Sequence, residues 1–320
     1  MKDNPFFPFS RKTFLVVGRA GMDFYADPPG TKIEGSGRFV AALGGSAANI
    51  AVALVRQGLG AALLSAVSDD AVGRYCRLEL RRYGVDDLLV SVKPGEFRTS
   101  LAVVETRDQD CQSVIYRNGA ADFQLENAEF NAAEFGALVL TGTVFAMEPS
   151  RSVGFQAIEK AKKSGIPVIL DVDFRRYSWA SESEASAVGS QVCALADIIV
   201  GNDEEFGMLA GGASRGLQLA RQMGSDAVVV YKMGAKGSVT ISPAGEFDTG
   251  IYRVTALKPT GAGDGFMGGF LAGLAAGAPL AEAVARGAAT AAIVVTQMGC
   301  APAMPTEDDV VRFMASHQMM

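Results

Sequence analysis

The sequence predicts an α/β fold in which a mostly parallel sheet is covered by helices on both faces. Two observations in the second half of the chain support this prediction: short runs alternate with helical stretches, and those runs are apolar almost throughout. Strands buried on both faces have such sequences, and their alternation with helices is typical of parallel sheets. We expect strands at residues 137–140, 168–171, 198–200 and 227–231, and helices that include residues 149–163 and 181–195.

The first part of the chain fits the same architecture. A short apolar run at residues 14–17 predicts the first strand. A helix is expected over residues 46–57, ended by Gly58, because glycine commonly follows the last turn of a helix. A strand near residues 61–67 and an amphipathic helix near residues 72–83 come next.

Two segments of mixed polarity interrupt this pattern and predict a separate β structure. Residues 31–42 and 99–116 have strand-like sequences in which polar and apolar residues are mixed, so they do not fit a sheet covered on both faces. We therefore expect a small β flap beside the core. Residues 262–313 are rich in Ala and Gly and are expected to be mostly helical.

Composition and charge argue against several classes of protein. The 320 residues are 49% hydrophobic, which is enough for a substantial core, and a net charge of −6 without a Lys/Arg block disfavours nucleic-acid binding. No run of twenty apolar residues occurs and the N-terminus lacks a signal-peptide layout, so we expect neither a membrane span nor secretion. Four scattered cysteines and one histidine argue against zinc sites and histidine triads, and they fit a cytoplasmic location.

Residues 258–270 carry the most informative motif of the chain. Gly261, Ala262 and Gly263 allow a tight turn, and an apolar helix of small residues follows directly. The free amide groups and the positive end of that helix then point at one place, which can bind phosphate or a developing anion. Asp264 lies inside this anion hole, where a carboxylate makes chemical sense if it removes a proton from an incoming hydroxyl. The motif therefore predicts phosphoryl transfer to an alcohol.

A glycine pair precedes the helix expected at residues 46–57. Gly44 and Gly45 allow a ligand to approach the backbone closely, and the Asn49 side chain offers both a donor and an acceptor. A tight turn capped by Ser46 would use the same residues, so the stretch has a structural interpretation as well as a functional one.

Two further candidates follow predicted strands. Arg175 could hold a phosphate or a carboxylate bidentately, although a surface salt bridge with Asp173 is the structural alternative. Asn202 and Glu205 could organise the water around Mg²⁺, which usually keeps several of its waters. Polar and acidic residues in the first turn of a helix are also ordinary capping residues, and that alternative stays open here.

The last candidate is the loop after the strand at residues 227–231. Lys232, Gly234 and Gly237 could cradle nucleotide phosphates, and a hairpin turn would use the same residues. No GxxxxGK[ST] loop occurs and no GxGxxG fingerprint follows the first strand. Walker-type and dinucleotide-binding sites are therefore disfavoured.

Together and in this order, these motifs resemble those of the ribokinase-like (PfkB) carbohydrate kinases over nearly the whole chain. Residues 44–49 match the family's N-terminal signature and residues 258–270 its more specific C-terminal one. Asn202 with Glu205 match the family's Mg²⁺-related motif, and the loop from Gly234 to Gly237 matches its nucleotide loop. The resemblance implies a Rossmann-like three-layer core with a mostly parallel sheet, a small β-sheet lid, and transfer from MgATP to a sugar hydroxyl.

The resemblance also implies a domain organisation. We expect one carbohydrate kinase domain over residues 1–320, with lid segments at about residues 19–43 and 96–119. The small sheet would have open edges, and such edges gain from pairing. We therefore expect a homodimer formed through the lid.

Roles for individual residues follow from the same resemblance. Asp264 is expected to be the catalytic base, with the anion hole at Gly261, Ala262 and Gly263. The expected sugar-binding residues are Asp23, Gly44, Gly45, Asn49, Arg117 and Arg175. The expected nucleotide-binding residues are Lys232, Gly234, Gly237, Thr260 and Gly263, and Asn202 and Glu205 are expected to act on Mg²⁺ through water.

Within the family, several stretches are similar to the subfamily that phosphorylates 5-dehydro-2-deoxygluconate in myo-inositol catabolism. They are residues 17–25, 116–122, 171–175, 202–206 and 299–306. An acidic sugar suits a cationic site, and Arg19, Arg117 and Arg175 are the candidate partners of its carboxylate. The enzyme alternatives are a 2-dehydro-3-deoxygluconate kinase, a ribokinase, a fructokinase or, less favoured, a nucleoside kinase. A sugar-binding regulatory protein on a kinase scaffold is the non-enzyme alternative.

One residue departs from the family pattern. Lys258 stands where many members carry an aspartate that helps to bind a monovalent cation beside the anion hole. Our hypothesis is that the Lys258 ammonium does the electrostatic work of that cation, so that the protein does not require K⁺. A surface lysine before Pro259 is the alternative.

Overall fold

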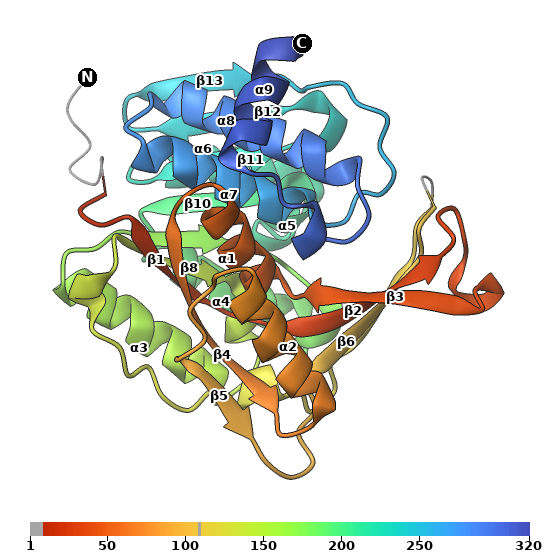
Figure 1. Cartoon of the computed structure of the whole chain (residues 1–320). Helices are drawn as coiled ribbons and strands as arrows, with labels where there is room; N and C mark the ends of the chain where they lie inside the picture. The colour runs from red at the N-terminus through yellow and green to blue at the C-terminus, as the bar shows by residue number, and fades with distance from the viewer. Residues whose placement is uncertain (1–8, 108–109) are drawn as a thin grey trace.

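The computed structural model describes residues 9–107 and 110–320, which form a large sheet between two layers of helices and a small projecting sheet (Figure 1). Across the large sheet of these residues the strands are β13 (Gly245–Thr249), β12 (Ser238–Ser242), β11 (Val228–Lys232), β10 (Ile198–Asn202), β9 (Val168–Asp171), β8 (Ala137–Thr141), β1 (Thr13–Val17), β4 (Gly60–Ser68) and β5 (Val90–Lys93). In this sheet of the described residues, β12 pairs antiparallel with both β11 and β13 and all other pairs are parallel, so the strands from β11 to β5 end at one edge. The predicted fold class is confirmed.

Two helical layers cover the sheet because consecutive strand residues point to opposite faces. Phe14 and Val16 of β1 join one core, whereas Leu15 and Val17 join the other. The first core is closed by α1 (Ser46–Arg56), α2 (Ala71–Arg82), α7 (Ala262–Ala275) and α8 (Leu280–Val295). The second is closed by α3 (Ser150–Lys163), α4 (Glu182–Cys193), α5 (Asp203–Leu209) and α6 (Gly216–Met223), while α9 (Glu307–Ser316) packs on α8.

The small sheet, which we call the lid, contains strands in the order β3 (Arg38–Gly44), β2 (Gly21–Asp27), β6 (Ser100–Val104) and β7 (Ser113–Tyr116). It projects from the side of the core (Figure 1). The strand expected over residues 31–42 is wrong in extent, because regular pairing with β2 begins only at Arg38. The residues before it form the tip of the lid.

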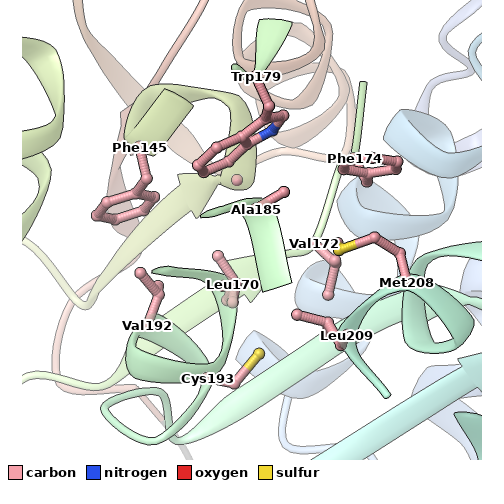
Figure 2. Close-up of a pocket in the computed structure, with 12 residues that line it drawn as sticks. Phe145, Leu170, Val172, Phe174, Trp179, Ala185, Val192, Cys193, Met208 and Leu209 are labelled. Carbon is pink, nitrogen blue, oxygen red and sulfur yellow. The ribbon is translucent and has the colours of Figure 1, made fainter. Parts of the chain in front are cut away.

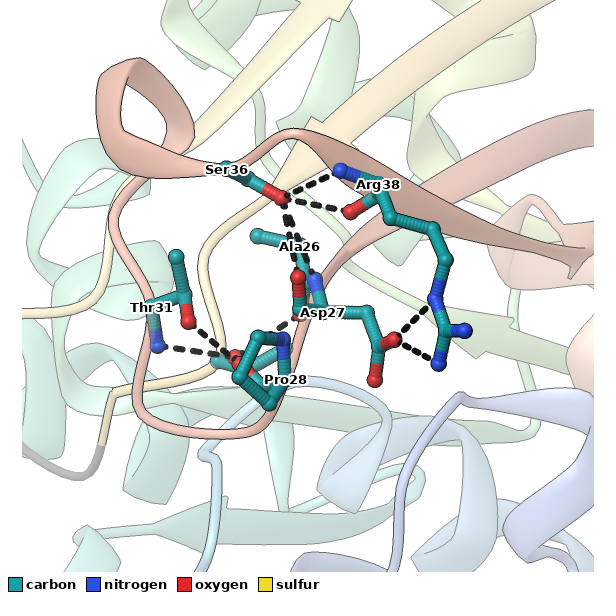
Figure 3. A network of polar contacts seen from close by, with 7 residues as sticks. Ala26, Asp27, Pro28, Thr31, Ser36 and Arg38 are labelled. Atoms are coloured by element: carbon teal, nitrogen blue, oxygen red, sulfur yellow. Dashed lines mark hydrogen bonds and ion pairs between the residues drawn. The ribbon is translucent and has the colours of Figure 1, made fainter.

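Local polar contacts explain why the tip is irregular. The Ser36 hydroxyl accepts from the backbone N–H groups of Asp27 and Arg38 at 3.3 Å, and the Arg38 guanidinium pairs with the Asp27 carboxylate (Figure 3). Thr31 bonds through its hydroxyl to the Pro28 carbonyl at 2.5 Å. These side chains form hydrogen bonds with the backbone, and such bonds compete with those to a neighbouring strand.

The hairpin of β12 and β13 was not predicted as strands. Three residues of β13 are exposed, so the strand lacks the apolar run that identifies an inner strand. In the described part of the chain, no helix is both long and apolar enough to cross a membrane.

Candidate active site

A cavity of about 290 Å³ lies between the lid and the edge at which the parallel strands end. Residues from both sheets line it: Arg19, Asp23, Tyr25, Gly45, Ser46, Asn49, Ala102, Val104, Ser113, Ile115, Arg117, Thr143, Asp173, Arg175, Tyr177, Thr260, Gly261, Asp264 and Cys300. The structure thus brings together predicted residues that lie more than two hundred positions apart in the sequence. They come from loops after the parallel strands, from the N-terminal ends of α1 and α7, and from the lid.

Asp23 and Tyr25 form the lid side of the cavity. They share one face of β2, and the Tyr25 hydroxyl lies 3.1 Å from both Asp23 Oδ2 and Cys300 Sγ, which links the lid to the core. Asp23 Oδ1 is buried without a hydrogen-bond partner in the described residues, so it is available to a ligand hydroxyl. Burial raises the pKa of the Asp23 carboxyl. A Cβ at Gly44 would lie 2.0 Å from Asp23 Oδ1, so glycine at this position leaves room for the carboxylate.

The predicted anion hole is formed by the turn before α7. Gly261 has a φ of +84°, which favours glycine, and no side chain caps the helix in the described structure. The amide groups of the first turn are therefore free of side-chain caps and point out of the helix end. The Lys232 ammonium lies 3.4 Å from the place where a Cβ on Gly263 would sit. A positive charge from β11 thus lies beside the helix N-terminus.

Asp264 is the third residue of α7 and faces the cavity. Its Oδ2 accepts a hydrogen bond of 2.8 Å from Asn49 Nδ2. Burial, together with the charge of Asp173, raises the pKa of Asp264 to about 7, whereas Asn49, Arg175 and Lys232 act in the opposite direction. A carboxyl with such a pKa can accept a proton and release it near neutrality.

Asp173 joins three parts of the site, and we did not single it out as a site residue from the sequence. Its carboxylate accepts from the Ser46 hydroxyl at 2.6 Å and from the Thr143 hydroxyl at 3.3 Å, and it pairs with Arg175 at 2.9 Å. Its φ of +36° is unusual for a residue with a side chain. The salt bridge considered as an alternative for Arg175 therefore exists, but it lies in the wall of the cavity and its carboxylate is buried.

Asn202 and Glu205 form a capping box at the start of α5. The Asn202 side chain accepts from the Glu205 N–H at 2.9 Å, and Glu205 Oε2 accepts from the Asn202 N–H at 2.7 Å. Glu205 Oε1 accepts from the Phe174 N–H at 3.2 Å. The capping alternative is thus present. Each carboxylate oxygen keeps a second lone pair, so Glu205 can accept hydrogen bonds from water bound to Mg²⁺.

The loop predicted to bind nucleotide phosphates connects β11 to β12 and is a hairpin turn. Gly234 and Gly237 have φ values of +56° and +82°, and a Cβ on Gly237 would lie 2.2 Å from the Thr249 carbonyl oxygen. Neither glycine lines the cavity, whereas Lys232 at the start of the loop reaches Gly263. The loop therefore lies next to the cavity on the side of the anion hole.

Lys258 is not a surface lysine, so that alternative is wrong. The residue is 0% exposed, and its ammonium donates to the Thr260 carbonyl oxygen. Burial lowers the pKa of Lys258, while the charges of Cys300, Asp264 and Asp23 favour the ammonium form. The end of the Lys258 side chain therefore lies inside the protein, at the carbonyl of the residue that precedes the Gly261 turn.

A second cavity, of only about 20 Å³, lies under the loop that carries Asp173 and Arg175 (Figure 2). Apolar side chains such as Leu170, Val192 and Leu209 surround it. Its volume is about that needed for one water molecule, so it cannot hold a sugar. The larger cavity is therefore the candidate active site.

Comparison with known proteins identifies the family. The model of the pfkB family carbohydrate kinases matches residues 11–307. The chain belongs to this family. This pfkB kinase is 38% identical over 320 residues to a 5-dehydro-2-deoxygluconokinase of Photobacterium profundum, with 95% of each chain covered.

Solved structures agree with the fold of this pfkB kinase. A double-mutant fructokinase of Vibrio cholerae O395, with fructose, ADP and potassium ion bound, has a TM-score of 0.82 and 26% identity, covering 96% of this chain and 99% of that one. A ribokinase II (described as putative) from E. coli, in complex with ATP and Mg²⁺, has a TM-score of 0.84 at 21% identity, covering 96% and 100%. The second likeness concerns the fold alone.

The pfkB motifs account for only part of the cavity. Tyr25, Tyr177 and Cys300 line it and were not singled out as site residues. Cys300 lies in a stretch similar to the subfamily, so a sequence signal existed. Tyr177 had no such signal, because its neighbours contain no recognisable motif.

Proposed function

We propose that this pfkB kinase transfers the γ-phosphoryl group of ATP to a hydroxyl of 5-dehydro-2-deoxygluconate. The observation that carries the chemistry is Asp264, a buried carboxyl with a pKa raised to about 7, directly behind a glycine turn and a free helix N-terminus. One oxygen of the Asp264 carboxyl accepts a hydrogen bond from Asn49. The carboxyl faces a cavity of about 290 Å³, which is the size of a small-molecule site.

The sugar is bound by the lid and by α1. Asp23 Oδ1 and Asn49 Oδ1 are buried and have no partner within the described structure, so each can accept a hydrogen bond from a sugar hydroxyl. Asp264 takes the proton of the acceptor hydroxyl as that oxygen attacks the γ-phosphorus. Proton removal of this kind contributes about 10²- to 10⁴-fold to the rate.

The charge of the transferring group is stabilised by the start of α7. The amide groups after Gly261 and the Lys232 ammonium lie on the same side of Asp264, and Thr260 Oγ1 is another buried group without a partner in the described residues. Bound Mg²⁺, held through water by Asn202 and Glu205, would neutralise phosphate charge. When the lid closes over the sugar it excludes water, which limits hydrolysis of ATP.

Two observations support an acidic acceptor. Arg19, Arg117 and Arg175 all line the cavity, and guanidinium groups bind carboxylates well. The relative from Photobacterium profundum, whose printed name is 5-dehydro-2-deoxygluconokinase, is 38% identical over almost the whole chain. A neutral sugar such as fructose has no group that needs these charges.

A substrate panel tests the proposal. The purified protein is assayed with MgATP and 5-dehydro-2-deoxygluconate, 2-dehydro-3-deoxygluconate, ribose or fructose, and kcat/KM is compared. We expect the highest value with 5-dehydro-2-deoxygluconate. A higher value with another sugar would reassign the acceptor, and absence of ATP consumption with every sugar would favour the regulatory alternative.

We further propose that residues 1–320 work as one catalytic domain and that the protein is a cytoplasmic homodimer formed through the lid. One lid face carries two apolar rows in register, Met22–Leu101–Tyr116 and Phe24–Val103–Val114. Met22 packs against the core, whereas Val114 and Tyr116 at the β7 ends are exposed. A second copy of the chain would cover them. The four unpaired cysteines support the cytoplasmic location.

A further inference from the structure

The three arginines of the cavity differ in their partners. The Arg117 guanidinium pairs with Asp122 at 2.5 Å, and the two side chains are only 4% and 3% exposed. It also donates to Ser178 Oγ at 3.3 Å and lies 4.1 Å from the centre of the Phe123 ring. The charge of Arg117 is thus balanced inside the protein, and its orientation is set by these neighbours.

Arg175 is balanced as well. Its guanidinium lies 2.9 Å from Asp173 Oδ1, and the other oxygen of that carboxylate is held by Ser46 and Thr143. The charges of this pair act on Asp264, since Asp173 raises the pKa of that carboxyl and Arg175 lowers it. Arg175 therefore belongs to the catalytic end of the cavity.

Arg19 has a different environment. It lies between β1 and β2, and its guanidinium donates to Ser100 Oγ at 3.0 Å. Among the described residues, no carboxylate forms an ion pair with it within 4.0 Å, although the charge of Arg19 does lower the pKa of Asp23. A Cβ on Gly21 would lie 2.8 Å from Arg19 Nη1, so glycine at that position keeps the space of the guanidinium open.

We infer that Arg19 is the specificity-determining residue of this site and that its guanidinium binds the carboxylate of the sugar acid. The inference rests on the proposed function and selects one arginine from three. In the described structure, Arg19 is the arginine of the cavity wall whose guanidinium donates to a hydroxyl and forms no ion pair. A neutral sugar leaves this cation without an anion, which disfavours neutral acceptors.

The position of Arg19 also suits the chemistry. Its charge acts on Asp23 and on Tyr177, whereas Asp173, Arg175 and Lys232 are the charges that act on Asp264. A carboxylate bound at Arg19 therefore lies on the lid side of the cavity, with Asp23 and Tyr177.

The test compares kcat/KM for 5-dehydro-2-deoxygluconate and for fructose in the wild type, Arg19→Gln, Arg19→Lys and the control Arg38→Gln. Removing a charged hydrogen bond lowers kcat/KM for the acid by about 10- to 100-fold, mainly through KM, so the acid-to-fructose ratio falls in Arg19→Gln. Arg19→Lys keeps the charge but loses the planar fork and should be intermediate. Arg38 lies at the lid tip with a side chain 78% exposed, so Arg38→Gln should match the wild type.

Folding is checked by thermal melts, and acid binding without ATP by the fluorescence of Trp179, the sole tryptophan of the chain. A folded Arg19→Gln with an unchanged acid-to-fructose ratio would overturn the role of Arg19, above all if Arg175→Gln changes that ratio instead. A wild-type enzyme that prefers fructose is a different result. It overturns the proposed acceptor, and the role of Arg19 with it.

Discussion

At the scale of single residues, the proposed mechanism depends on the protonation of Asp264. Only the ionised carboxylate can accept the hydroxyl proton, and burial raises its pKa to about 7. We expect kcat/KM to rise with pH and to level off above an inflection near this value. Asn49→Leu removes the hydrogen bond that favours the ionised form, so the inflection should move to higher pH. An unchanged inflection in a folded, active Asn49→Leu variant would contradict this assignment.

Replacement of Asp264 should have opposite effects on turnover and on stability. Asp264→Asn should lower kcat by about 10²- to 10⁴-fold, with ATP binding retained in calorimetry. The carboxyl titrates near 3.8 when unfolded and near 7 when folded, so its ionisation lowers the free energy of unfolding as pH rises between these values. Asp264→Asn should therefore melt above the wild type at pH 8, and this difference should shrink toward pH 4. Near-normal turnover would refute the base assignment.

Lys258 gives a prediction about potassium. Its buried ammonium bonds to the Thr260 carbonyl beside the anion hole, where it can do the work of a monovalent cation. We expect equal steady-state rates in KCl and in tetramethylammonium chloride of equal ionic strength. Strong activation by K⁺ would show that the lysine does not replace the cation.

At the scale of elements, glycines set how closely the helices pack. A Cβ on Gly268 of α7 would lie 2.3 Å from the Ala53 Cβ of α1 and 3.1 Å from its backbone carbon. Gly268→Ala gains about 1 kcal/mol of helix propensity, but overpacking against a backbone costs about 1–3 kcal/mol. We expect a net loss in the free energy of unfolding, measured with urea.

The matched control is Gly189→Ala in α4. Its Cβ would meet only the end of the Leu209 side chain, at 2.6 Å, and both residues border the cavity of about 20 Å³. Leu209 can move into that space, so this variant should be as stable as the wild type or more stable. If both variants lost the same free energy of unfolding, the space around the added Cβ would not explain the loss.

The elements themselves were predicted with uneven success. The strand predicted at residues 168–171 coincides with β9, and the helix ended by Gly58 corresponds to α1, because apolar runs and glycine stops are local signals. The strand predicted from residue 31 began too early, since β3 begins at Arg38, and β2, β5 and the hairpin of β12 and β13 were not predicted as strands. β3 and β13 are partly exposed, and pairing with a neighbour, rather than their own composition, makes them strands.

At the scale of the whole molecule, the exposed apolar residues of the lid lead us to expect a dimer. Val114 and Tyr116 are 42% and 63% exposed on the lid face away from Asp23 and Tyr25. The double variant Val114→Glu/Tyr116→Glu should be a monomer in light scattering, whereas the wild type should be a dimer. Leu88→Glu, at a site 84% exposed outside the lid, is the control and should remain dimeric. A monomeric wild type would refute the proposed dimer.

Local sequence was sufficient to predict the fold class, the positions of the main strands along the chain and the glycine turn before Asp264. These features depend on neighbours within a few positions, such as the turn at Gly261 that precedes Asp264. Contacts between distant residues could not be predicted in this way: Asp173 bonds to Ser46 across 127 positions, and Lys258 is buried although its neighbours suggested nothing of the kind. Only the folded chain determines which arginine lacks an acidic partner, because ion pairs form between elements that the fold brings together.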